Sequence, residues 1–202
     1  MGFHRRHIVH DERGATIVMA LVFFLICAII GSVVLTAASV NAKAVQTHKV
    51  AQQQEFTVGS AAQMVGSELA AAQLVVKDDG SGVGIASDAN WVFAYNFWDA
   101  NGASIMAACR PSSGAGQSFE RPIRVTLPDG SATAVIDPVY GKLVVDPDLN
   151  ITVTLSLDQD LTAASPYKMT VWLQCVPTYD ARGKLLSFAY EGPVVQKAED
   201  AA

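Results

Sequence analysis

The chain has 202 residues, of which 50% are hydrophobic and 16% are charged, and its formal net charge is −5. This length allows one membrane segment and one modest globular domain, and it excludes two full domains in addition to such a segment. A mildly acidic body offers no basic patch for phosphates, so we do not expect nucleic-acid binding.

The first 14 residues form a short leader that is predicted to stay in the cytoplasm. It carries Arg5, Arg6 and Arg13, and positive charge flanking a membrane helix marks its cytoplasmic side. The apolar run that follows has no charged residue for about 29 positions, whereas a bilayer core needs only about 20 helical residues. The sequence therefore predicts a transmembrane helix over 15–42 that anchors the chain in membrane lipid, with everything after it exported.

A removable signal peptide is the alternative interpretation of this run. Small-residue triplets that suit a signal peptidase, Val40-Asn41-Ala42 and Ala42-Lys43-Ala44, occur at its end. The apolar region of a secretory signal is only about 7–15 residues long, which is shorter than this run. We therefore expect a permanent anchor.

An amphipathic helix is predicted to continue the membrane helix over 43–77. This stretch lacks proline, and apolar side chains recur in it at alternating spacings of four and three, which indicates one buried helical stripe. The stripe consists of Val58, Ala62, Val65, Leu69, Ala72 and Val76. The loop "KDDGSGVG" then ends the helix with glycines and aspartates.

Residues 78–202 are predicted to form an exported antiparallel β-sheet domain. "WVFAYNFW" and "ASIMAACR" flank the turn "DANG", and "RPIRVTL" and "SATAVID" flank "PDG". "KLVV", "ITVTLSL", "KMTVWLQC" and "KLLSFAYEG" follow as further strands, the last after the turn "DARG". Tight turns between successive strands favour antiparallel pairing, and the sheet would supply the apolar face that the helix stripe needs. The predicted fold class is α+β, with one long N-terminal helix packed on an antiparallel sheet.

The order of leader, apolar helix, amphipathic continuation and sheet resembles a type IV pilin-like protein. The local match is "ERGATIVMALVFFL", which is similar to the N-terminus of minor pilins and pseudopilins. The resemblance implies a pilin-like fold and cleavage by a prepilin peptidase between Gly14 and Ala15. It also implies other pilin-like subunits as partners, in a pilus or a secretion filament.

One position departs from the pattern of the major pilins. Their fifth mature residue is usually a glutamate that pairs with a neighbouring subunit's terminal amine, and here that position is Met19. Glu12 precedes the implied cleavage and would be lost with the leader. A minor or accessory subunit is therefore expected, and the alternative is a solitary anchored surface domain that binds a sugar or a peptide.

No enzymatic activity and no cofactor are expected. Histidine is the common general base near neutral pH, and all four histidines precede the predicted sheet domain. "DPDLN" places Asp146, Asp148 and Asn150 at the first three ligand spacings of a calcium loop, but Ile151 and Leu157 occupy its glycine and final acid positions. A turn explains this stretch better than a metal site does.

Aromatic residues are the candidates for ligand contact. Trp91, Phe93, Tyr95 and Phe97 alternate along a predicted strand, where such a stripe is more often core than binding surface. Trp172 lies opposite the apolar face of its own strand, so it is the best candidate for an exposed contact residue.

The two cysteines outside the apolar run are candidates for a disulfide. Cys109 and Cys175 are each predicted to end a strand and to point toward the apolar side of the sheet. A bond between them would close a loop of about 66 residues and add about 4 kcal/mol in the chain-entropy model. Two free thiols in the core are the alternative.

Overall fold

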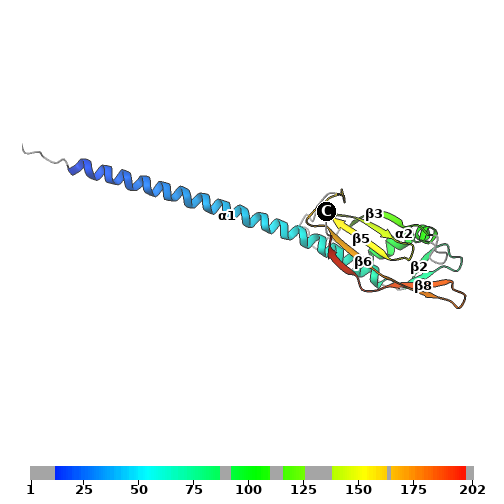
Figure 1. Cartoon of the computed structure of the whole chain (residues 1–202). Coiled ribbons are helices and arrows are strands. Elements are labelled where there is room, and N and C mark those ends of the chain that lie inside the picture. The colour runs from blue at the N-terminus through cyan, green and yellow to red at the C-terminus, as the bar shows by residue number, and fades with distance from the viewer. Residues whose placement is uncertain (1–11, 87–91, 110–115, 126–137, 163–164, 199–202) are drawn as a thin grey trace, which may run out of the picture. The chain divides into compact units, whose positions relative to one another are not determined.

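The computed structural model describes residues 12–86, 92–109, 116–125, 138–162 and 165–198 (Figure 1). Within these ranges the chain is α+β, with a long N-terminal helix, a second shorter helix and two antiparallel sheets. The chain divides into two compact units, Met1–Ala51 and Gln52–Ala202, and helix α1 (Glu12–Ala71) contributes residues to both.

The first unit contains the apolar part of α1. All described side chains from Thr16 to Val50 are exposed. An 18-residue window of this helix has a mean hydropathy of 3.0, and none of it is buried. The helix predicted over 15–42 lies within α1, and its length and composition suit one membrane span.

In the second unit, the last turns of α1 bury the predicted apolar stripe. Val58, Val65 and Leu69 are fully buried in the core. The helix ends at Ala71, before the predicted end at Lys77, because Leu74–Val76 form strand β1. This strand, with the β-branched Val75 and Val76, pairs with β2 (Val83–Ile85) and with β8 (Leu185–Tyr190), so sheet pairing replaces the last predicted helical turn.

The strands form two sheets instead of the single predicted sheet. The four-stranded sheet has the order β2-β1-β8-β7, and the five-stranded sheet has the order β3-β4-β5-β6-β9. Every pairing is antiparallel, as predicted. The remaining strands are β3 (Phe119–Val125), β4 (Val139–Val145), β5 (Ile151–Ser156), β6 (Met169–Leu173), β7 (Cys175–Tyr179) and β9 (Val194–Lys197). The predicted strand "SATAVID" lies outside the described residues.

The alternation seen in the sequence sets the two faces of the five-stranded sheet. Ile151, Val153 and Leu155 of β5 are fully buried, whereas Thr152 and Thr154 between them are only partly buried. The predicted turn "DARG" joins β7 to β8. The Asp180 carboxylate accepts hydrogen bonds from the backbone N–H groups of Arg182 and Lys184, and Gly183 has a φ of 79°, which glycine adopts readily.

The hairpin predicted around "DANG" is wrong, because Val92–Cys109 form helix α2. The buried positions Ala94, Phe97, Trp98, Asn101 and Ile105 follow a helical period, whereas the aromatic alternation follows a strand period. Asn101 donates to the Phe97 carbonyl at 2.8 Å instead of forming a turn.

The same correction applies to two candidate site residues. Cys109 ends helix α2 instead of a strand, and it is buried one turn after Ile105. Phe93, Tyr95 and Phe97 lie on a helix, where Phe97 is buried and Tyr95 is exposed. Trp91 lies outside the described residues.

Close contact between α1 and the five-stranded sheet requires a glycine at position 66. A Cβ atom built there would lie 2.8 Å from Cβ of Pro193 and 3.0 Å from Cγ1 of Val171. At Gly59, two turns earlier, the nearest atom would be Cε of Met169 at 4.0 Å. The helix therefore approaches the sheet most closely near Gly66.

Candidate functional site

The apolar helix of the first unit satisfies its own polar groups. The hydroxyls of Ser32, Thr36 and Ser39 donate to carbonyls of the preceding turn at 2.8–2.9 Å. In lipid, a side-chain hydroxyl without a partner is costly, and bonding back to the helix removes that cost. These hydroxyls are thus compatible with a membrane span.

The predicted processing site lies at the start of this helix. Gly14 and Ala15 fall within the first turn of α1, and the leader up to residue 11 lies outside the described residues. Cleavage between Gly14 and Ala15 remains a prediction.

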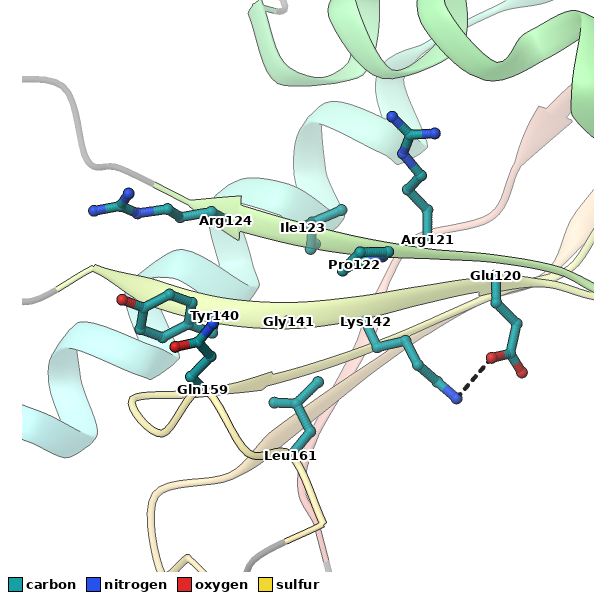
Figure 2. A pocket seen from close by; sticks show the side chains of 10 residues that line it. All are labelled: Glu120, Arg121, Pro122, Ile123, Arg124, Tyr140, Gly141, Lys142, Gln159 and Leu161. Atoms are coloured by element: carbon teal, nitrogen blue, oxygen red, sulfur yellow. Dashed lines mark hydrogen bonds and ion pairs between the residues drawn. The ribbon is translucent and has the colours of Figure 1, made fainter.

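The outer face of the five-stranded sheet carries a hollow of about 700 Å³. Strands β3 and β4 form its floor, and Gln159 and Leu161 from the segment after β5 form one wall (Figure 2). In the register of this hairpin, Arg124 is opposite Tyr140 and Pro122 is opposite Lys142. The hollow is therefore built on paired strands, which hold side chains in defined positions.

Two charge arrangements occur in this hollow. The Lys142 ammonium donates to the Glu120 carboxylate at 3.0 Å, and both side chains are exposed. The Arg124 guanidinium lies 5.9 Å from the centroid of the Tyr140 ring, within the range of a cation–π contact. The hollow could not be predicted from the sequence, because its lining comes from two segments separated along the chain.

Cys109 and Cys175 are buried as free thiols around the turn between β4 and β5. Sγ of Cys109 lies 3.9 Å from the carbonyl oxygen of Val145, and the backbone N–H of Cys175 donates to Oδ1 of Asn150 at 3.0 Å. Burial raises the pKa of Cys109 to about 11 and that of Cys175 to about 12, and the Asp146 carboxylate adds to both shifts. Both thiols are protonated at neutral pH, so they are poor nucleophiles in the folded protein.

Tyr190 belongs to the same buried region. Its hydroxyl donates to the Leu149 carbonyl at 3.0 Å, and burial raises its pKa well above the ordinary value. Its ring packs against Trp98 and Phe188, with centroids 6.3 and 6.0 Å away. This arrangement is that of a hydrogen-bonded core tyrosine.

The turn predicted at "DPDLN" is confirmed. The Asp146 carboxylate accepts bonds from the N–H groups of Asp148 and Asn150 and from the Asn150 side chain, all at 2.9 Å. Leu149 has a φ of 67° and is buried. Among the described residues, no group of three or more His, Cys, Asp or Glu side chains could hold a metal ion.

Trp172 is exposed on the outer face of the five-stranded sheet, as its place on strand β6 predicted. Its side chain is 41% exposed, and its cross-strand partners are Thr152 and Val194. Val194 is also exposed, at 43%. A contact role for Trp172 remains a prediction.

Glu68 is a further structural residue that the sequence did not single out. Its carboxylate accepts hydrogen bonds from the backbone N–H groups of Phe93 and Ala94, at 2.7 and 3.2 Å. These groups begin α2, and the N–H groups of a first helical turn have no partner within the helix. Glu68 of α1 therefore caps α2 from a neighbouring element.

Comparison of the chain with protein-family models, with curated proteins and with solved structures gives no match. The interpretation of this protein consequently depends on its own residues. Two features outside the core are available for function: the exposed apolar helix of the first unit and the outer face of the five-stranded sheet.

Proposed function

We propose that this protein is a membrane-anchored, exported structural component, acting as a minor or accessory subunit of a type IV pilus-like or secretion filament. The observation that supports it is the apolar part of α1. Its 18-residue window has a mean hydropathy of 3.0 and buries nothing within the chain. A soluble protein would have to cover so long an apolar surface, and lipid covers it here.

The orientation follows from the charges at the ends of the apolar run. Arg5, Arg6 and Arg13 keep the leader in the cytoplasm, and Lys43 is the first charged residue on the other side. The second unit is therefore exported. In this proposal the apolar helix contacts membrane lipid first and other pilin-like subunits after processing.

Processing by a prepilin peptidase would remove the leader after Gly14. The mature chain would then begin with Ala15 and would have Met19 where the major pilins usually carry an acid. A subunit without that acid suits a minor or accessory position. No catalytic role is proposed for any side chain of the second unit.

Substitution of Gly14 in the native host tests this function. Gly14→Leu should leave the leader attached, seen as a heavier band on denaturing gels, and should remove the protein from the sheared filament fraction. Gly31→Leu is the matched control for removal of the leader, because a Cβ atom at Gly31 meets nothing within 4 Å in the chain. Normal maturation and normal surface release of Gly14→Leu would rule out the proposed processing.

A second candidate function is a solitary anchored domain that binds a ligand. The hollow between β3, β4 and the segment after β5 favours it, because ligand sites are concave and carry a few convergent polar groups. The sheared filament fraction distinguishes the two functions. A filament subunit appears in that fraction, whereas a solitary domain stays with the membrane whatever residue occupies position 14.

A further inference from the structure

We propose that the hollow on the outer face of the five-stranded sheet binds a carboxylate-bearing sugar unit, such as a uronic acid in an acidic polysaccharide. This binding does not depend on whether the chain enters a filament. Three features support this proposal: the unpaired charge of Arg124, the partly buried Tyr140 ring beside it and the polar groups around them.

On the Tyr140 side of β3, Arg124 is the charge that is left to bind a ligand. Lys142 is already paired with Glu120 at 3.0 Å, whereas no carboxylate among the described residues forms an ion pair with Arg124. Arg124 is exposed at the end of β3 and contacts the Tyr140 ring. A guanidinium presents a planar fork of donors that matches a carboxylate in a bidentate pair.

The rest of the lining suits the other parts of a sugar. The Tyr140 ring, Pro122 and Leu161 supply apolar surface for the C–H face of a pyranose. The Gln159 amide and the Lys142–Glu120 pair supply donors and acceptors for hydroxyl groups (Figure 2). The volume of about 700 Å³ accommodates one or two sugar units.

An extended peptide fits this face less well. Strand β3 is an edge strand, and a peptide would have to add to its free edge through main-chain hydrogen bonds. Pro122, in the middle of β3, has no N–H group, and proline protects sheet edges against such pairing. Nucleic acid is disfavoured because the chain is acidic, with a net charge of −5.

The strand itself offers a matched control for Arg124. Arg121 also lies on β3, is exposed and belongs to the lining of the hollow, but its register partner is Leu143, which belongs to the buried face. Figure 2 shows its side chain pointing away from Tyr140, Gln159 and Leu161. Arg121→Gln and Arg124→Gln therefore remove the same charge from the same strand on opposite sides.

The test measures binding of a galacturonic acid hexamer to the full chain in nanodiscs of zwitterionic lipid. The methyl-esterified hexamer is the control ligand, because it keeps the sugar and removes the charge. The acid form should bind about tenfold more tightly than the ester, because the ester cannot form the charge-assisted bidentate pair with the guanidinium. Arg124→Gln should remove that preference, and Tyr140→Leu should weaken both ligands.

Arg121→Gln should change binding by no more than about twofold, because its exposed side chain points away from Tyr140 and Gln159. Circular dichroism of each variant verifies that the fold is retained. Equal losses of affinity for the acid hexamer in Arg121→Gln and Arg124→Gln would overturn the proposal. Equal affinity of the parent chain for the acid and the ester would overturn it as well. Tighter binding of a hexa-aspartate peptide than of the sugar acid would assign the hollow to acidic peptides instead, and no binding at about 10 mM ligand would exclude a site.

Discussion

At the level of single residues, a few polar side chains of the second unit accept hydrogen bonds from backbone N–H groups that have no backbone acceptor. Glu68 accepts from two N–H groups at the start of α2, and Asp146 and Asn150 close the turn after β4. Each of these groups sits where a regular element begins or ends. Their loss leaves backbone donors without acceptors in a partly buried setting.

Replacing Glu68 should destabilise the second unit. Glu68→Gln keeps the shape of the side chain and removes the charge that interacts with two N–H groups and with the positive end of α2. We expect a loss of about 1–2 kcal/mol in the free energy of unfolding, measured by denaturant titration in detergent. Glu55→Gln is the control, because the Glu55–Lys197 pair is exposed and 3.7 Å apart; equal effects of the two changes would contradict the capping role.

The buried thiols predict a loss of stability at alkaline pH. Their folded pKa values of about 11 and about 12 lie above the ordinary value of 9.0. Their contribution to stability is therefore complete below pH 9.0, and it decreases as the pH rises through the folded values. A Cys109→Ala, Cys175→Ala double variant should lose less stability between pH 9 and pH 11 than the parent chain, and an unchanged slope would contradict the burial of both thiols.

Alkylation distinguishes the two states of these cysteines. In the folded protein at pH 8, Cys109 and Cys175 should resist iodoacetamide, because they are buried and protonated. After unfolding without a reductant, both should react, as the free thiols of the structure require. A linked Cys109–Cys175 peptide in non-reduced mass mapping would instead establish the disulfide.

At the scale of elements, the stability of the second unit depends on how closely α1 lies over the five-stranded sheet. Gly66→Ala should destabilise the unit by about 1 kcal/mol or more, because the added methyl meets the rigid ring of Pro193 at 2.8 Å. Gly59→Ala should be neutral or stabilising by up to about 1 kcal/mol, since its Cβ has room and alanine favours helices. Thermal unfolding of the two variants checks this, and the reverse order would exclude the observed packing.

The elements also show how far the sequence determines the fold. The apolar helix, the buried stripe of α1 and strands such as β5 could be predicted, since one period dominates each segment. Helix α2 could not be predicted. Its aromatic residues alternate with a period of two, whereas its buried residues, from Ala94 to Ile105, recur with a helical period. Asn101 and Gly102 have the composition of a turn, yet Asn101 bonds within the helix and Gly102 lies against Val83.

The candidate sites depend still more on tertiary structure. Exposure of Trp172 follows from strand alternation alone. The hollow near Tyr140 needs the pairing of β3 with β4 and the path of the segment after β5. Glu68 can cap α2 only because the fold brings α1 beside the start of that helix. No local sequence pattern specifies which of these segments come together in the fold.

At the level of the whole molecule, the buried core and the apolar window fall in different units. Among the described residues, all that belong to the buried core lie at Val58 or later, within the second unit, and the apolar window lies in the first. A chain that starts at Gln52 should therefore fold as a soluble protein. Near-ultraviolet circular dichroism of the Trp98 cluster should match that of the full chain, and a spectrum without tertiary signal would contradict the division into units.

We propose that the apolar helix is a membrane anchor whose leader is removed after Gly14. Mass spectrometry of the N-terminal peptide from native membranes or sheared filaments tests it most directly. We expect a mature chain that begins with Ala15, with or without N-methylation. A chain that begins with Met1 would contradict processing and leave a plain anchored domain, and one that begins with Lys43 or Val45 would contradict the anchor itself.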